Sequence, residues 1–352
     1  MTDSPESEIL IIGGGLCGLA LADRLTREGR DWRLVEARAR FGGRIAGLAH
    51  GGTTFDLGPS WIWPGQSRAA AMAARFGIVL FEQHSDGATC HEGPDGSVQR
   101  VRAFSPMAGS LRMTGGMTAL VEAMVRTLEP ERLHLDAPIV ALTRHDDRIE
   151  ATLRSGETLR ARQVVLAIPP RIASALAFDP SLPQAATRAM GAIPTWMAGM
   201  AKFVAVYDRP FWRTAGLSGD ATSRRGPIVE IHDASAAGGE PGALFGFLGV
   251  PASAREDVTA ELAPACIDQL ARLFGEEART PAAMHLADWA REPFTATTAD
   301  HTPLGGHPAY GPHPALAGLW DSHLHIAVTE TAPDAGGLIE GALAAAESLT
   351  LR

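Results

Sequence analysis

Lysine, tyrosine and cysteine are scarce in this chain of 352 residues. Of its 31 Lys+Arg residues only Lys202 is a lysine, and only two tyrosines occur. The three cysteines, Cys17, Cys90 and Cys266, form no CxxC pair, so the sequence predicts neither a disulfide framework nor a zinc site. The twelve histidines show no paired ligand spacing, and we expect no metal.

A basic block and a long apolar run are absent as well. The formal net charge is -9, which argues against nucleic acid or an anionic membrane as the main partner. No apolar stretch approaches the roughly 20 residues that span a bilayer, and the polar, acidic residues 1–8 do not resemble a signal peptide. We therefore expect a cytoplasmic protein. Its length allows two domain-sized units, or one large α/β unit with an inserted layer.

The first 36 residues carry a nucleotide-binding pattern. An apolar run at 9–12 is followed by a GxGxxG turn with Gly13, Gly15 and Gly18 and by a predicted helix at 19–27. A predicted second strand at 32–35 then ends on the acid Glu36. Glycines at this spacing let the backbone approach a pyrophosphate at the helix N-terminus. An acid after the second strand can accept hydrogen bonds from ribose hydroxyls. The whole βαβ context makes this signal much more specific than GxGxxG alone.

The residues that follow indicate which dinucleotide is bound. The segment from Glu36 to Arg44 reads EARARFGGR and includes Arg38, and Asp56 begins DLGPS, which contains Gly58, Pro59 and Ser60. Here the sequence resembles the flavin-containing monoamine oxidase family, in a short form that lacks the large helical substrate insert. The resemblance implies FAD as cofactor, with glycines that permit close backbone approach and arginines that supply charge for the phosphates.

Later blocks match the family in order, so the resemblance covers nearly the whole chain. They include APIV with Ile139, the strand whose backbone would hold the adenine, DWAREPF with Trp289, and the C-terminal TETAPDAGGLIEGA with Glu330, Leu338 and Ile339. In the family this last element closes over the flavin, and its helix N-terminus favours the anionic reduced form.

The implied fold is a glutathione-reductase-like α/β FAD-binding domain of the Rossmann βαβ type, with a reduced, mixed-sheet substrate domain inserted. We place the discontinuous FAD-binding domain at 1–78, 114–191 and 290–352. The substrate domain is expected at 79–113 and 192–289.

Lys202 is the candidate catalytic residue. Lysines at this position in the family hold a water against flavin N5 and assist the reaction of reduced flavin with oxygen. Its neighbours include Met200, Phe203 and Val204, an apolar setting in which an unpaired ammonium is costly. In a chain that otherwise uses arginine, a lone lysine indicates a need for a compact donor or for a group that can lose its proton.

Several departures limit what the resemblance implies. Thr298 stands where some members link a cysteine to the flavin, so FAD should be bound noncovalently. Ala299 and Leu338 replace the pair of tyrosines that flanks the substrate amine, and Trp61 is the nearest aromatic candidate for the substrate pocket. The short segment 81–111, which contains a hairpin-turn signal at 92–97, replaces a helical roof. We therefore expect an open flavin face, or a lid supplied by a partner or by a second copy in a homodimer.

The predicted activity is oxidation of a carbon–nitrogen bond in an amine. A neutral amine passes a hydride equivalent to flavin N5, the imine hydrolyses, and oxygen reoxidises the flavin. Two alternatives remain open: a renalase-like oxidase of dihydronicotinamide-type ring substrates, and an FAD-holding subunit that needs a protein partner.

Overall fold

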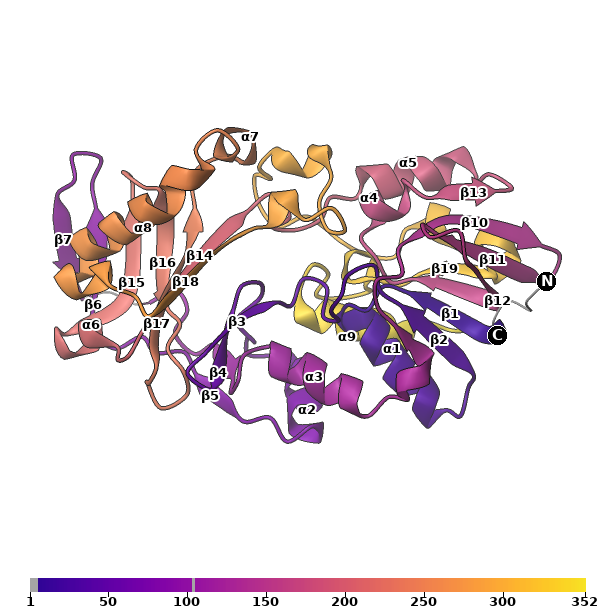
Figure 1. The fold of residues 1–352 in the computed structure, drawn as a ribbon, viewed down its shortest axis with the longest axis horizontal. Coiled ribbons are helices and arrows are strands. Elements are labelled where there is room, and N and C mark those ends of the chain that lie inside the picture. Colours follow the sequence, from indigo (N-terminus) through magenta and orange to yellow (C-terminus); the bar gives the residue numbers. More distant parts are fainter. Residues whose placement is uncertain (1–5, 103–104) are drawn as a thin grey trace.

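The structure is a computed structural model that describes residues 6–102 and 105–352. The expectation that the N-terminus is not a signal peptide concerns mainly residues 1–5, which lie outside the described residues. Residues 103 and 104, in the short segment 81–111, lie outside them as well. The chain forms two lobes, each built on one large sheet, and the first and last described residues lie in the same lobe (Figure 1).

The first lobe contains an eight-stranded sheet in the order β13-β10-β11-β12-β1-β2-β9, with β19 paired to β12. Its strands are β1 (Glu6–Ile12), β2 (Trp32–Val35), β9 (Leu133–His134), β10 (Ile139–His145), β11 (Arg148–Leu153), β12 (Thr158–Leu166), β13 (Ala177–Asp179) and β19 (Leu324–Ile326). Strands β12, β1, β2 and β9 run parallel. Buried on both faces, β1 sends Ile9 and Ile11 into one core and Leu10 and Ile12 into the other.

The second lobe contains a seven-stranded mixed sheet in the order β18-β14-β17-β16-β15-β6-β7. Its strands are β6 (Ala88–Glu92), β7 (Val98–Val101), β14 (Ala201–Tyr207), β15 (Leu217–Ser223), β16 (Ile228–Asp233), β17 (Gly242–Leu248) and β18 (Ala283–Asp288). Among the described residues of this sheet, β15 and β6 pair in parallel, and the other neighbouring strands pair antiparallel. The hairpin predicted at 92–97 is confirmed, because β6 and β7 pair antiparallel across it.

Helices cover the faces of both sheets. They are α1 (Leu16–Arg27), α2 (Ser67–Arg75), α3 (Thr118–Arg126), α4 (Pro170–Ala173), α5 (Gln184–Ala192), α6 (Phe211–Thr214), α7 (Ala252–Arg255), α8 (Thr259–Phe274) and α9 (Ile339–Ser348). In the first lobe α1, α3 and α9 pack on one face, and α4 and α5 lie on the other. In the second lobe α8 covers one face, through Leu262 and Leu270.

Short elements connect the lobes. Two small antiparallel strand pairs lie outside the large sheets: β3 (Gly47–His50) with β4 (Thr53–Asp56), which is a hairpin, and β5 (Leu80–Glu82) with β8 (Leu111–Met113). The short 3-10 helices are η1 (Pro130–Arg132), η2 (Glu276–Arg279), η3 (Trp289–Arg291), η4 (Thr298–His301), η5 (Pro314–Leu316), η6 (Leu319–Ser322) and η7 (Thr329–Thr331).

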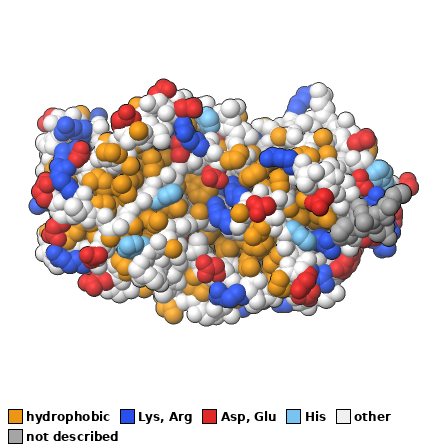
Figure 2. Space-filling view, in the orientation of Figure 1, with side chains coloured by type: hydrophobic (Ala, Val, Ile, Leu, Met, Phe, Trp, Pro, Cys, Tyr) orange, Lys and Arg blue, Asp and Glu red, His pale blue; other side chains and the backbone are white. Residues whose placement is uncertain are grey.

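The predicted α/β architecture, a Rossmann-type βαβ unit with an inserted mixed sheet, is confirmed. The first helix is longer than predicted: α1 begins at Leu16, inside the glycine turn, so Gly18 lies in its first turn. On the face seen in Figure 2, hydrophobic side chains gather over the second lobe and again where the lobes meet, and charged side chains lie along the edges and also near the middle of the face.

Candidate active site

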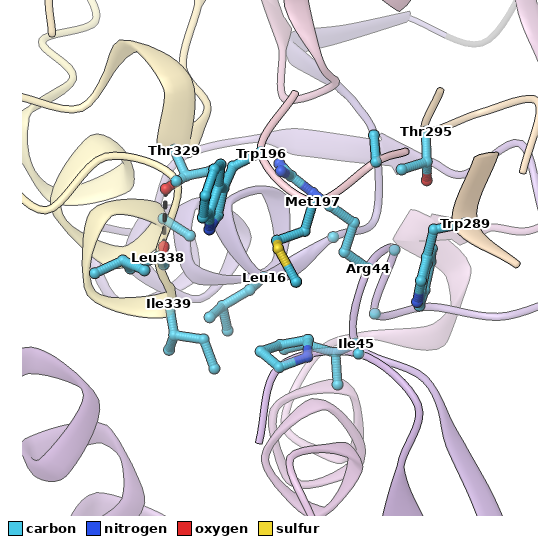
Figure 3. Close-up of a pocket in the computed structure, with 18 of the residues that line it drawn as sticks. Leu16, Arg44, Ile45, Trp196, Met197, Trp289, Thr295, Thr329, Leu338 and Ile339 are labelled. Carbon is cyan, nitrogen blue, oxygen red and sulfur yellow. Dashed lines mark hydrogen bonds between the residues drawn. The ribbon is translucent and has the colours of Figure 1, made fainter. Parts of the chain in front are cut away.

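A cavity of about 460 Å³ lies at the junction of the lobes. It runs from the glycine turn of the first lobe, past the segment after β4, to the second sheet and the start of α9 (Figure 3). Of the residues that the sequence nominates for cofactor or substrate, thirteen line it: Gly13, Gly15, Glu36, Arg38, Arg44, Gly58, Pro59, Ser60, Trp61, Lys202, Trp289, Leu338 and Ile339.

The glycine turn brings backbone to the cavity wall. Gly13 has φ +113, and a Cβ there would lie 2.6 Å from the Ala167 carbonyl oxygen. Gly15, just before α1, faces the cavity beside Gly43. The first N–H groups of α1 have no partner within the helix and carry the positive end of its dipole. A pyrophosphate is the kind of group that this end of the cavity suits.

Gly18 serves the turn without lining the cavity. A Cβ at Gly18 would come within 1.9 Å of the Gly13 carbonyl oxygen, so the close contact between helix and turn requires glycine there. This agrees with the packing role of the third glycine in the fingerprint.

Glu36 ends β2 and braces the turn. Its Oε2 accepts a hydrogen bond from the Gly14 amide at 2.8 Å, and its Oε1 accepts one from the Arg38 amide at 2.9 Å. The carboxylate is 4% exposed and still lines the cavity. Its position is therefore fixed before any ribose hydroxyl reaches it.

Two arginines from the EARARFGGR segment are paired with acids from the end of the chain. Arg44 donates to both oxygens of the buried Glu330, at 2.5 and 3.1 Å. Burial lowers the pKa of Arg44, but Glu330 outweighs it and raises the pKa above its ordinary value. Arg38 donates to Glu292 at 3.1 Å and to Thr295 at 2.8 Å. Glu330 thus positions Arg44 and does not line the cavity itself.

The C-terminal block closes one side of the cavity. Thr329 donates to the Leu338 carbonyl at 2.8 Å, which holds the residue that precedes α9 (Figure 3). Ile339, the first residue of α9, also lines the cavity. Glu340 faces away and caps α2 by accepting from the Ala69 amide at 2.9 Å.

Lys202 lies in β14 on the cavity face of the second sheet and is 2% exposed. Its Nζ donates to the Gly58 carbonyl at 3.0 Å and to the Ser60 hydroxyl at 2.7 Å, and it lies 3.9 Å from the centre of the Phe245 ring. Burial is the largest cause that lowers the pKa of Lys202 to about 7; Asp56 opposes this and Arg112 adds to it. The ammonium is therefore poised to lose its proton near neutral pH.

Aromatic side chains form much of the substrate end. Trp61 lines the cavity, and its Nε1 donates to Gln83 at 2.9 Å. Trp196 and Met197, which the sequence analysis missed, line it too (Figure 3). Met197 has φ +62, an uncommon conformation for a residue with a side chain. Their place in a loop between α5 and β14 gave no periodic signal.

One carboxylate, Glu230 on β16, also lines the cavity and was missed. Its partner in strand register is Phe247 of β17, whose partner on the other side is Lys202 of β14. The three side chains therefore form one row across adjacent strands on the same face. Glu230 and His232, polar residues at alternate positions of one strand, are the signal that could have identified this row.

Besides Gly18 and Glu330, two more nominated residues lie outside the cavity lining. Ile139 is in the core of the first lobe at the start of β10 and does not line the cavity. Ala299, expected in the substrate pocket, is exposed in η4 and does not line the cavity. The reason is local, because Asp300 is anchored inward by Thr297 and by the Thr195 amide, which turns η4 away from the cavity. Thr298 is exposed in the same turn.

The residues present fit FAD. A glycine turn at a helix N-terminus, a fixed acid after β2, an arginine held by Glu330 and the start of α9 surround one continuous cavity. The glycine turn and the arginine would hold the pyrophosphate, the acid would hold the ribose, and the start of α9 would lie against the flavin ring. The fold and site define an FAD-dependent oxidoreductase of the Rossmann-type class.

Comparison with known protein families shows which family the chain belongs to. The family profile described as flavin containing amine oxidoreductase matches residues 89–348, and that of an NAD(P)-binding Rossmann-like domain matches residues 11–76. The chain therefore belongs to the flavin-containing amine oxidoreductase family, with FAD as its cofactor and an amine as the substrate class.

Individual relatives match from two thirds of the chain to nearly all of it. Putrescine oxidase of Kocuria rosea is 24% identical over 98% of this chain and 95% of its own length. The probable flavin-containing monoamine oxidase A of Dictyostelium discoideum is 30% identical over 66% of this chain and 50% of its own. Among solved structures, a putrescine oxidase (A394C mutant) has a TM-score of 0.80 at 18% identity, covering 98% of both chains, which shows a shared fold. Within the described residues, no helix has the length and apolar character to cross a membrane.

Proposed function

We propose that the chain oxidises the carbon–nitrogen bond of an amine that carries a second positive charge, such as a diamine with amino groups at both ends. The observation that carries this proposal is Glu230, a carboxylate in the wall of a largely apolar cavity, in the same cross-strand row as Lys202. FAD, when bound, supplies the hydride acceptor, and the chain's residues supply orientation and charge.

The spacing of that row suits a substrate with two separated nitrogens. Lys202 and Glu230 lie on strands that are two positions apart, with β17 between them. At about 4.8 Å per strand spacing, their backbones are about 10 Å apart. A four- or five-carbon diamine could therefore keep one ammonium at Glu230 while its other, reacting nitrogen lies toward the Lys202 end.

The two ends of the cavity favour different protonation states. At the reacting end Trp196 and Leu338 provide apolar surface, which disfavours a charged amine and so favours the neutral form that can be oxidised. At the other end Glu230 favours a charged one. Putrescine, the diamine in the name of the Kocuria rosea relative, has this chemistry.

Lys202 is proposed as the residue that assists reaction with oxygen. Its Nζ, fixed by Gly58 and Ser60, has three hydrogens and two hydrogen-bond partners in the described residues, which leaves one for a water or an oxygen species. Noncovalent FAD, cytoplasmic location and a homodimer or lid-supplying partner remain predictions. Heat release of FAD into solution tests the first, and light scattering of the FAD-loaded protein tests the last.

The proposal is tested by anaerobic absorbance titration of the FAD-loaded protein with a diamine, a monoamine of equal chain length and a dihydronicotinamide. We expect the diamine to bleach the flavin at the lowest concentration, and oxygen to restore the colour with release of peroxide. In E230Q the half-bleaching concentration of the diamine should rise by about 10- to 100-fold, the loss of one charge-assisted hydrogen bond.

The exposed Glu122 on α3 offers a matched control, because E122Q removes the same charge far from the cavity. Equal bleaching by the diamine and the monoamine, unchanged in E230Q, would overturn the proposed substrate class. Bleaching by the dihydronicotinamide alone would favour the renalase-like alternative.

A further inference from the structure

Glu230 is the end of a three-residue chain of hydrogen bonds. His232 Nε2 lies 2.8 Å from Glu230 Oε1, and His232 Nδ1 lies 2.9 Å from Asp220 Oδ1. Asp220 is in β15, directly across from His232 on β16 by the register of the strand pair. The chain thus leads from the buried interior of the second lobe to a carboxylate in the cavity wall.

The inner two members of this chain are sealed from water. Asp220 is 2% exposed and His232 is 1% exposed, whereas the Glu230 side chain is 40% exposed. The Oδ2 atom of Asp220 has no hydrogen-bond partner in the described part of the chain. Among the described side chains, the Asp220 carboxylate is therefore hydrogen-bonded to His232, and the same imidazole is bonded to Glu230.

The surroundings of His232 contain few other charges. The ring of Trp61 meets it edge-on at 5.1 Å, and Phe245 of β17 lies 5.5 Å away. Beyond Phe245 is the ammonium of Lys202 on β14, over the same ring. The charged groups in contact with the imidazole are Asp220 from β15 and Glu230 from β16, so these two carboxylates dominate its titration.

The number of protons on the ring decides whether the chain is complete. An imidazolium donates from both nitrogens and satisfies both carboxylates, but a neutral imidazole has one N–H and leaves a lone pair facing a carboxylate oxygen. Before substrate binds, the chain therefore favours a protonated His232. That ring is a positive charge already held against Glu230.

We propose that His232, fixed by Asp220, is a specificity-determining residue whose proton competes with the second ammonium of the substrate for Glu230. The inference rests on the proposed function, because it concerns a substrate with two charges. An ammonium at Glu230 adds a second positive charge beside the imidazolium, so binding that ammonium and losing the His232 proton favour one another, and the linkage is reciprocal.

The direction of the pH dependence follows. Burial lowers the pKa of His232, but its hydrogen bonds and charge interactions with Asp220 and Glu230 outweigh burial and raise the pKa above the ordinary value of about 6.5. Below that raised pKa the proton occupies the site and weakens diamine binding; above it diamine binding strengthens. A monoamine, which has no second ammonium, should not sense this proton.

The test is the ratio of kcat/KM for a diamine to kcat/KM for a monoamine of equal length, measured from roughly pH 6 to 9, a window around the histidine pKa. Because both substrates use Lys202 and FAD in the same way, their titrations cancel in the ratio. In the wild-type protein the ratio should rise with pH, by no more than about tenfold per pH unit for a single proton. In D220N the rise should move to lower pH, because the carboxylate that retains the His232 proton is gone.

Two further variants complete the design. H232Q can still donate a hydrogen bond to Glu230 but carries no charge, so it should abolish the rise. H91Q is the matched control, because His91 is hydrogen-bonded to Thr222 on β15 and is not one of the three linked residues Asp220, His232 and Glu230. A rise at the same pH in wild type, D220N and H232Q would overturn the inference, even if E230Q removes the preference for the diamine. No preference for the diamine in any variant would instead mean that the proposed substrate class is wrong. A merely structural role of Asp220 would lower stability without shifting the pH of the rise.

Discussion

At the cavity, the two lobes hold charge in different ways. In the first lobe the charged residues at the cavity meet partners of opposite charge or backbone N–H groups: Arg44 is paired with Glu330, and Glu36 accepts from two amides. In the second lobe Lys202 has only neutral hydrogen-bond partners in the described residues, and Glu230 depends on one histidine. The first arrangement fixes charge, whereas the second leaves it able to change.

This difference matches what each lobe has to do. A cofactor with a constant shape and charge needs a constant site, which saturated ion pairs supply. A substrate that must lose a proton and then electrons needs groups whose protonation can respond. The pKa of Lys202, lowered to about 7, and the imidazole between two acids both meet that need.

The largest expected effect comes from removing a fixed charge in the first lobe, the Arg44 partner of Glu330. In R44M, Glu330 keeps a fully buried carboxylate without its cation, and we expect the holoprotein to lose about 3–5 kcal/mol in free energy of unfolding, together with much of its FAD. Denaturant titration and the ratio of flavin to protein absorbance measure the two losses.

A surface ion pair gives the control for that prediction. Arg126 lies 3.9 Å from Glu122 on α3, with both side chains about two-thirds exposed. R126M should change the free energy of unfolding by less than about 1 kcal/mol. If R44M and R126M had equal effects, the pairing in the first lobe would not contribute to its rigidity.

The next largest effect concerns Lys202, the titratable group in the second lobe. In K202M the reaction of the reduced enzyme with oxygen should slow by about 100-fold, since a positive charge that favours developing negative charge on oxygen is lost. The ammonium is present below its pKa of about 7, so the wild-type rate should fall as pH rises through 7, and the variant should lack that fall. Stopped-flow mixing of reduced enzyme with oxygen measures both, and K202R, which keeps the charge but cannot titrate, separates charge from proton loss. Oxygen reactivity unchanged in K202M would contradict the proposed role.

The first lobe could be predicted from sequence to a degree that the second could not. The glycine turn, Glu36 and the EARARFGGR segment act at fixed chain distances, so their spacing specifies where they lie. Glu230, by contrast, reaches the cavity only through the register of β14, β17 and β16. The alternation of Glu230 and His232 indicates a polar face on one strand, but it does not specify which strands lie beside it. Ala299 shows the limit of the resemblance: its position along the chain matches the family, but the anchoring of Asp300 turns the backbone elsewhere.

Trp196 gives the smallest expected effect and shows how the second lobe compensates for its missing tyrosines. Its loop is tied down at two points, because Tyr310 donates to the Pro194 carbonyl at 2.7 Å and the Thr195 amide donates to Asp300. His307 also packs edge-on against its ring, with centroids 5.0 Å apart. A ring held so firmly at the cavity wall can serve as the aromatic surface that Ala299 and Leu338 do not provide.

The substitution W196L should therefore raise KM about fivefold for diamines and monoamines alike, the effect of one lost aromatic contact, while W196F should stay within about twofold. Y310F removes only the hydroxyl that holds the loop, so its effect should fall between these two values. Steady-state kinetics on the FAD-loaded variants tests this order. A W196L variant that loses FAD but keeps its KM would show that the ring contacts the cofactor and not the substrate. The loop before β14 would then belong with the fixed cofactor-binding residues of the first lobe.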